Sequence, residues 1–485
     1  MIRSIRRLSV VLAVLLLAVL ANLTYLQYFA AADIRAQGGN SRVLLEEYSR
    51  QRGPILLGST AIASSIPTDD QLKYLRQYAN GPLYAPATGF YSVVYGATGI
   101  ERAENSVLSG SDDRFFVDRV AQLFAGRGVQ GGAVRLTLNP KAQQAAYEGL
   151  AGRTGAVAAI DPRTGAILAL VSSPSFDPNL LSSHDPASIR TAYNGYVSDP
   201  NQPLLNRPIA MTLPPGSTFK LVTAAAALET GRYTPSTVVP GPAALKLPNT
   251  TRELNNWSGS ACGPGDKTTF ENALAVSCNT AFASIGLDVG ADALRTQAQK
   301  FGFDTSFQIP LRVATSRFPQ DPDLPQTAMS AIGQFDVTAT ALQMAMVGAG
   351  IANNGQVMYP YLVAQTLSPE LEVLENAEPK AYSQAMSPAN AATLLGMMVT
   401  VVERGTGSNA RIPGVTVGGK TGTAQTAPGQ PPHAWFVGVA PADQAGGAQV
   451  AVAVVLQNGG GAPEISGNKL AAPIAKAVMQ AVVSR

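Results

Sequence analysis

Histidine and cysteine are nearly absent from this sequence, with two residues of each among 485. His184 and His433 stand far apart, and no motif for a nucleophile accompanies either of them. Metal catalysis requires a cluster of His, Cys and carboxylate ligands, which two histidines and two cysteines do not supply. We therefore expect no metal, no cofactor and no hydrolase that depends on a histidine base.

A strong net charge is absent as well. The 35 Lys and Arg residues nearly balance the 32 Asp and Glu residues, which leaves a net charge of +3. Proteins that bind duplex nucleic acid concentrate Lys and Arg on one face, and the sequence shows no such cluster. Nucleic acid is therefore not an expected partner. The length and the 46% hydrophobic content indicate instead a folded protein of two or three domains.

A long hydrophobic run stands at the N-terminus. Residues 8–30 carry no charge and are enough to cross a ~30 Å hydrocarbon layer as a helix. Arginines in residues 1–7 should stay in the cytoplasm. We expect a cytoplasmic tail, a single-pass anchor at residues 8–30 in the cell membrane, and an extracytoplasmic remainder. The alternative is a signal peptide cleaved near residues 30–32, although its apolar region is usually only ~7–15 residues long.

Both cysteines follow the predicted anchor. Cys262 and Cys278 would therefore face an oxidising compartment, where such thiols pair. Their bridge would close a loop of roughly 15 residues and contribute about 3 kcal/mol in the chain-entropy model. The alternative is two unrelated buried thiols.

The residue pattern of the chain changes near residue 135. Residues 31–135 are rich in turn signals and predict a stem or accessory domain with short strands. Residues 136–485 are expected to form the catalytic domain. It opens with a helix whose N-cap is Asn139 and whose first residue is Pro140.

The expected catalytic domain has strands at both ends and helices in the middle. Apolar runs at 157–160 and 167–171 flank a turn and predict a hairpin, in a sheet covered on both faces. Helical patterns follow around 270–287 and 338–355, before strands and a last helix return near the C-terminus. We expect one sheet that is completed by both ends of the domain's sequence.

Ser217 follows Pro-Pro-Gly and stands at the N-terminus of a predicted helix that ends at Gly231. Free N–H groups at such an end favour a developing negative charge. Lys220 projects from the same face, and apolar surroundings lower the pKa of such a lysine. The pair suggests a nucleophile and its base. A serine that begins an ordinary helix is the alternative, and Ser466 and Lys469 repeat the same spacing.

Two later motifs strengthen the catalytic interpretation. Ser277-Cys278-Asn279 lies between two predicted helices. Residues 417–424 form a predicted strand with three glycines, which weaken a strand unless another backbone or a ligand must approach closely. Lys420 of this strand would keep Lys220 neutral and attract a carboxylate. The alternative is an edge strand with a bulge.

The motifs occur in the order Ser-x-x-Lys, Ser-x-Asn, Lys-Thr-Gly, with gaps of about 60 and 140 residues. In this order they resemble the penicillin-binding protein and serine β-lactamase superfamily. The resemblance runs from about Leu136 to the C-terminus, and residues 52–55 resemble the start of the stem in monofunctional class B transpeptidases. The short chain without added C-terminal modules is most similar to actinobacterial members. This implies an α/β (α+β) fold with an antiparallel sheet flanked by helices, and an all-helical subdomain.

The resemblance implies catalytic roles for four residues. Ser217 corresponds to the acylated nucleophile and Lys220 to its general base. Ser277 would relay the proton to the leaving amine, and Lys420 would hold the hydrogen-bond network of Ser277.

It also implies a substrate-binding group. Asn279 would bind the substrate amide, and the N–H groups of Ser217 and Thr423 would form the oxyanion hole. Thr421 and Thr423 would hold the terminal carboxylate beside Gly422. Because residues three apart face opposite sides of a regular strand, a bulge or twist is expected at Gly422.

The implied reaction is D,D-transpeptidation of peptidoglycan. Ser217 attacks a D-Ala-D-Ala stem peptide, D-Ala leaves, and an amine of a neighbouring stem resolves the acyl-enzyme. β-Lactams would acylate the same serine. We expect a role in cell wall synthesis at division, with divisome or elongation proteins as partners. The region before residue 136 has no room for a glycosyltransferase domain.

Three alternatives share this fold. A D,D-carboxypeptidase would resolve the acyl-enzyme with water. A β-lactamase would need a deacylating group, and no convincing glutamate stands in the sequence. A catalytically inactive β-lactam sensor would use the fold for binding only, which three intact motifs argue against.

Overall fold

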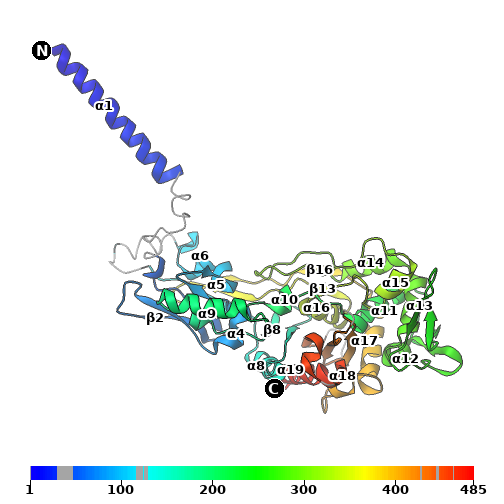
Figure 1. Ribbon diagram of the computed structural model, residues 1–485. Coiled ribbons are helices and arrows are strands. Elements are labelled where there is room, and N and C mark those ends of the chain that lie inside the picture. Colours follow the sequence, from blue (N-terminus) through cyan, green and yellow to red (C-terminus); the bar gives the residue numbers. More distant parts are fainter. Residues whose placement is uncertain are drawn as a thin grey trace.

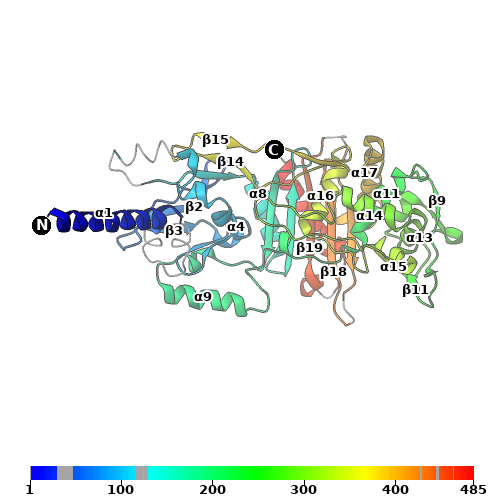
Figure 2. The same cartoon turned by 90° about the horizontal axis from the view of Figure 1, so that it is seen from above.

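The computed structural model describes residues 2–29, 47–115, 124, 129–426, 429–443, 447–462 and 464–484. Apart from α1 (Ile2–Thr24), these residues form an elongated body (Figures 1 and 2). α1 projects from one end of the body, and none of the span Ile5–Tyr28, with a mean hydropathy of 2.4, is buried. This helix is long and apolar enough to cross a membrane, in agreement with the predicted single-pass anchor.

The middle of the body is built on a five-stranded antiparallel sheet in the order β17-β18-β19-β7-β8. The strands are β7 (Gly155–Ile160), β8 (Ile167–Ser173), β17 (Gly418–Ala424), β18 (His433–Ala440) and β19 (Val450–Leu456). β7 and β8 are the predicted hairpin, and β7 pairs with β19. The prediction that both ends of the sequence complete one sheet is therefore confirmed.

Helices cover both faces of this sheet, as its apolar strands predict. α8 (Pro140–Leu150) and α19 (Ala472–Val483) pack on one face, and α16 (Ala341–Ala352) packs on the other. Every residue of β7, β18 and β19 is buried. α8 begins as predicted, because Asn139 Oδ1 accepts the N–H of Ala142 at 3.1 Å.

Helices and short strand pairs form the end of the body farthest from α1 (Figure 1). The helices are α11 (Lys220–Glu229), α12 (Phe270–Ala275), α13 (Asn279–Val289), α14 (Ala291–Lys300), α15 (Leu324–Ser330) and α17 (Pro388–Glu403). Beside them, β9 (Val238–Pro240) pairs with β12 (Lys267–Thr269), and β10 (Ala244–Lys246) with β11 (Glu253–Asn255). The fold is therefore the mixed one predicted, with a mostly helical part beside the sheet.

A second sheet, of six strands, lies in the stem between α1 and the central sheet, in the order β15-β14-β6-β1-β2-β3. The strands are β1 (Ile55–Leu57), β2 (Thr60–Pro67), β3 (Tyr74–Tyr78), β6 (Ala133–Leu136), β14 (Val363–Leu367) and β15 (Val373–Asn376). β14 and β15 come from far later in the sequence than the other four. Without β14, β6 would be an open sheet edge, so this late hairpin protects it and ties the stem to the rest of the chain.

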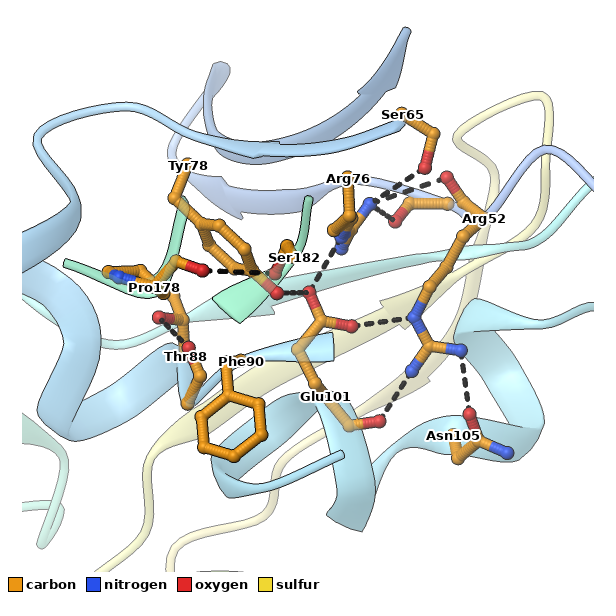
Figure 3. Close-up of polar contacts among 12 residues, drawn as sticks. Arg52, Ser65, Arg76, Tyr78, Thr88, Phe90, Glu101, Asn105, Pro178 and Ser182 are labelled. Carbon is orange, nitrogen blue, oxygen red and sulfur yellow. Dashed lines mark hydrogen bonds and ion pairs between the residues drawn. The ribbon is translucent and has the colours of Figure 1, made fainter. Parts of the chain in front are cut away.

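A buried ion cluster joins the helices and strands of the stem (Figure 3). Glu101, in α5 (Gly99–Ala103), accepts the Nε–H groups of Arg52 and Arg76, each at 2.6 Å, and the hydroxyl of Tyr78 at 3.0 Å. Burial acts to raise the pKa of Glu101, but Arg76 and Arg52 outweigh it, and the pKa lies below its ordinary value. The carboxylate is therefore charged at neutral pH.

Replacing this carboxylate should destabilise the chain strongly. Glu101→Gln leaves two buried guanidinium groups without a counter-charge, which costs about 3–5 kcal/mol. We expect the urea midpoint of the chain in detergent, followed by circular dichroism, to fall accordingly. Because the pKa of Glu101 is lowered, its contribution is present above the ordinary glutamate pKa and is lost as pH falls toward the lowered value.

Glu375→Gln is the matched control, because Glu375 pairs with Arg114 at 2.9 Å but its side chain is 68% exposed. An exposed pair contributes about 0–1 kcal/mol. Equal midpoints for the two variants would contradict the role assigned to Glu101.

Candidate active site

Ser217 lies inside a 3-10 turn, Gly216–Phe219, that runs directly into α11. The helix predicted to begin at Ser217 therefore begins at Lys220, behind this turn. Pro215 already has helical dihedral angles, φ −75° and ψ −15°, so the chain turns before it reaches the serine. The neighbours of Ser217 are buried, whereas its own side chain is half-buried. The turn thus presents one hydroxyl from an otherwise closed surface.

Lys220 is the first residue of α11 and is fully buried. Its Nζ donates to Ser277 O at 2.8 Å, to Ser277 Oγ at 3.3 Å and to Asn279 Oδ1 at 2.7 Å. The ring of Phe282 lies 5.6 Å from Nζ. Burial, and then the nearby Lys420, hold the pKa of Lys220 well below its ordinary value. The lysine predicted to be neutral is therefore in a setting that favours the neutral form.

Lys420 approaches the same hydroxyl from β17. It is fully buried, and its Nζ donates to Ser277 Oγ at 2.9 Å and to Thr421 O at 3.0 Å. Burial lowers the pKa of Lys420 to about 7. Ser277 Oγ thus lies between two lysines, which joins all three motifs in one hydrogen-bonded group.

Ser277 occupies the turn between α12 and α13 in a left-handed conformation, with φ 61°. Such a conformation costs of order 1–3 kcal/mol for a residue other than glycine and persists only where the surroundings enforce it. Here it directs the hydroxyl toward both lysines. No sequence pattern indicated this strain.

Gly422 allows β17 to lie against the turn that carries Ser217. A Cβ at this position would stand 3.0 Å from both Pro215 O and Thr218 Cγ2. The prediction that a glycine here permits close approach of another backbone is confirmed. The expected bulge is absent, since β17 pairs with β18 without a register shift from Gly418 to Ala424. Lys420 therefore lies on the same face of the strand as Gly422, and Thr423 lies on the opposite face.

The two threonines of the motif lie on the other face of β17. Thr421 Oγ1 shares a hydrogen bond of 2.7 Å with Thr406 Oγ1, and Thr423 is half-buried. Among the described residues, no hydrogen bond joins the side chain of Thr423 or the hydroxyl of Ser217 to another motif residue. Catalytic hydrogen bonds are often long in ligand-free sites and tighten when substrate binds.

The predicted disulfide is present. Cys262 and Cys278 are bonded, with their Cα atoms 6.0 Å apart. Cys278 is the central residue of the Ser-x-Asn motif, and Cys262 follows β11. The bridge therefore tethers the segment after β11 directly to the turn that carries Ser277.

Family models match almost the whole body of the chain. The penicillin-binding protein transpeptidase domain matches residues 155–480, and the penicillin-binding protein A dimerisation domain matches residues 52–134. The chain belongs to the penicillin-binding protein transpeptidases. The resemblance seen in the three motifs is thereby confirmed.

Relatives of this penicillin-binding protein resemble it along their full length. Peptidoglycan D,D-transpeptidase PbpA of Mycolicibacterium smegmatis is 46% identical over 99% of both chains, and PbpA of Mycobacterium tuberculosis H37Rv is 44% identical over the same share. The structure of penicillin-binding protein A from M. tuberculosis as a ceftriaxone acyl-enzyme complex is 43% identical, with a TM-score of 0.88 over 91% of this chain and 100% of that one. These relatives agree with the actinobacterial type that the sequence indicated.

The repeated Ser-x-x-Lys spacing near the C-terminus is not part of this penicillin-binding protein's site. Ser466 Oγ caps α18 (Gly467–Leu470) by accepting the N–H of Lys469 at 3.1 Å. The side chain of Lys469 is 61% exposed and pairs with Glu464. Ser466 therefore only begins a helix, which is the alternative that the sequence also left open for Ser217.

Among the described residues of this penicillin-binding protein, no hydrogen bond joins either histidine to the three motifs, although His433 pairs with Ala424 at the end of β17. His433 Nδ1 accepts the N–H of Asn458 at 3.0 Å, and burial lowers its pKa to about 4. His184 contacts Asp70 in the stem. Within the described ranges, no group of three His, Cys, Asp or Glu side chains is placed to hold a metal ion.

Sequence reasoning missed two residues that support the motifs. Thr406, in the loop after α17, bonds to Thr421 and also donates its N–H to Ala275 O at 3.0 Å. Asn256 contacts the first turn of α13. Both are common loop residues, and only the three-dimensional contacts distinguish them.

Proposed function

We propose that this chain is a peptidoglycan D,D-transpeptidase that cross-links stem peptides through an acyl-enzyme on Ser217. The observation that carries the proposal is the position of Ser277 Oγ, 3.3 Å from Lys220 Nζ and 2.9 Å from Lys420 Nζ, beside the turn that presents Ser217. Two buried lysines of lowered pKa around one hydroxyl form a proton-transfer group next to a nucleophile. The mycobacterial relatives carry the name peptidoglycan D,D-transpeptidase.

Acylation follows from this arrangement. Ser217 Oγ attacks the carbonyl carbon of the penultimate D-Ala while its proton passes to neutral Lys220. The C–N bond to the terminal D-Ala then breaks as Ser277 delivers its proton to the leaving amine, and Lys220 passes the proton taken from Ser217 on to Ser277. Lys420 stays bonded to Ser277 Oγ and holds it between the two lysines.

Backbone N–H groups would stabilise the oxyanion. We assign the N–H groups of Ser217 and Thr423 to this role. Thr423 lies on β17, which is an edge strand among the described residues, so that its outer N–H groups have no neighbouring strand. Asn279 would bind the substrate amide. Of the two threonines proposed for the terminal carboxylate, Thr423 is the better placed, since the hydroxyl of Thr421 already bonds to Thr406. Gly422 would contribute by its backbone between them.

The arrangement in the cell follows from α1. We propose that residues 1–7 are cytoplasmic, residues 8–30 span the membrane, and the stem (31–135) and catalytic domain (136–485) lie outside. The family matches at 52–134 and 155–480 fall within these bounds. Division or elongation proteins would recruit the enzyme.

Transpeptidation and hydrolysis differ in what resolves the acyl-enzyme. The chain in detergent should be incubated with a peptide that ends in D-Ala-D-Ala, with and without a stem peptide that bears a free amine. We expect a cross-linked product by mass spectrometry and faster D-Ala release when the acceptor is present. Lys469→Ala, which removes the lysine of the second Ser-x-x-Lys spacing, should leave both unchanged.

Other results would favour other members of the fold. Release of D-Ala at one rate with or without acceptor, and only hydrolysed product, would identify a carboxypeptidase. Absence of release, with penicillin still bound, would identify a non-catalytic β-lactam-binding protein.

A further inference from the structure

The first turn of α13 is capped by a side chain from a distant segment of the chain. The initial N–H groups of a helix have no intrahelical acceptors and need others. The N-cap residue, Cys278, provides no side-chain cap, and its sulfur is in the disulfide. Asn256, directly after β11, provides the acceptor instead. Its Oδ1 accepts the N–H of Asn279 at 2.9 Å and that of Thr280 at 3.1 Å.

Asn256 is held rigidly for this task. It is only 7% exposed. Its Nδ2 donates to Pro242 O at 2.9 Å and to Ser260 O at 3.0 Å, so both ends of the carboxamide are engaged. A buried amide with every polar atom bonded has one favourable orientation, and that orientation places Oδ1 at the start of α13.

The residue before Asn256 orients the side chain of Asn279. Asn255 O accepts from Asn279 Nδ2 at 3.1 Å, while Asn279 Oδ1 accepts from Lys220 Nζ at 2.7 Å. The segment 255–256 therefore fixes both the backbone and the carboxamide of Asn279. Ser277 lies two residues earlier, in the left-handed turn that leads directly into this helix.

We propose that Asn256 is a positioning residue of the transpeptidase. It caps α13 from a separate segment and thereby holds Asn279 and Ser277 against the two lysines, without touching substrate. The disulfide cannot replace it, because a covalent tether at Cys278 offers no acceptor for the N–H groups of Asn279 and Thr280. This inference rests on the proposed function, since it assigns a role in the same reaction.

The test separates binding from chemistry in the reaction with penicillin G. The chain in detergent yields the dissociation constant of the non-covalent complex and the first-order acylation constant k2. In Asn256→Ala two N–H groups lose their acceptor, and we expect k2 to fall about 10- to 100-fold with little change in the dissociation constant. Asn256→Asp keeps the acceptor oxygen at α13, but its second oxygen must be protonated to face Pro242 O and Ser260 O and can donate to only one of them, so we expect k2 to lie between those of Asn256→Ala and the parent.

Hydrogen exchange provides a readout that is independent of catalysis. The amides of Asn279 and Thr280 should exchange faster in Asn256→Ala than in the parent, and at an intermediate rate in Asn256→Asp. Thr251→Ala, a truncation at an exposed position just before β11, should alter neither exchange nor k2. Should Asn256→Ala fail to fold, Asn256→Asp and the parent still give both readouts.

Three results would overturn the inference. A folded Asn256→Ala with parental k2 would reduce Asn256 to a structural residue. If Asn256→Asp folds like the parent but shows the acylation defect expected for Asn256→Ala, the acceptor oxygen at the start of α13 does not determine the acylation rate. A parent chain that never reacts with penicillin would overturn the proposed function, and with it the positioning role, whereas the first two results leave that function intact.

Discussion

Ser217→Ala is expected to form no covalent adduct with a fluorescent penicillin, whereas the parent chain forms one that survives denaturing electrophoresis. The substitution removes the hydroxyl that the 3-10 turn presents and leaves both lysines in place. Loss of the nucleophile from a site whose residues act as a unit lowers the rate by at least about 10⁴-fold. Intact mass should show one added penicilloyl group on the parent and none on the variant.

The control for this variant is Ser466→Ala, which removes the serine of the second Ser-x-x-Lys spacing and should label like the parent. An adduct that persists in Ser217→Ala would place the nucleophile elsewhere. An adduct that turns over rapidly in the parent would favour a β-lactamase over a transpeptidase.

Lys220→Met is expected to lower the acylation rate by about 10²–10⁴-fold, the range that a general base contributes. Methionine fills the buried space of the lysine stem without an amine. The parent rate should rise with pH through the lowered pKa of Lys220, because only the neutral amine accepts the proton of Ser217. The variant should lose this dependence. Measuring acylation between pH 5 and pH 9 checks both statements.

The same variant should lose a pH-dependent penalty on folding, while Ser277 O and Asn279 Oδ1 lose a buried donor at every pH. Burial lowers the pKa of Lys220, so the unfolded chain holds a proton that the folded chain holds weakly, and folding is penalised at pH values below the ordinary lysine pKa. Removing the amine removes this penalty, and the gain should grow as pH falls. A higher urea midpoint together with lost acylation would exclude misfolding as the cause. A difference in urea midpoint that does not change with pH would contradict the assignment, and exposed Lys469→Met should change neither property.

Much of the scaffold could be predicted from residue patterns because local rules determine it. Asn139 and Pro140 start α8 through capping and proline geometry. The apolar runs that became β7 and β8 need only two short hydrophobic segments on either side of a turn. The motifs on α11, the Ser277 turn and β17 indicated one site because their order is specific, although nothing in the spacing gives the distances.

The remaining features depend on contacts between distant segments. The pairing of β14 with β6 satisfies an edge that no single stretch of sequence reveals. The left-handed conformation of Ser277 is imposed by its surroundings rather than by serine itself. The sequence around Asn256 does not distinguish it from the other asparagines, and only its contact with the start of α13 indicates a role. Of the bulge or twist expected at Gly422, the bulge was wrong, because β17 keeps its register with β18 past this residue and Lys420 and Thr423 stay on opposite faces.

The pairing of β7 with β19 sets an order of events during synthesis. The polypeptide leaves the ribosome from its N-terminus, so Ser217 and Ser277 are outside long before β17, β18 and β19 exist to close the sheet. The edge of β7 stays unpaired until β19, which ends at Leu456, has been synthesised. The paired residues are separated by most of the sequence of the catalytic domain, and such distant pairings form slowly. A nascent or truncated chain that ends before Lys420 therefore carries the serine without its second lysine. In the proposed mechanism the segment from β17 to the C-terminus completes the site, and a β-lactam that acylates Ser217 meets both lysines only after this segment has been made.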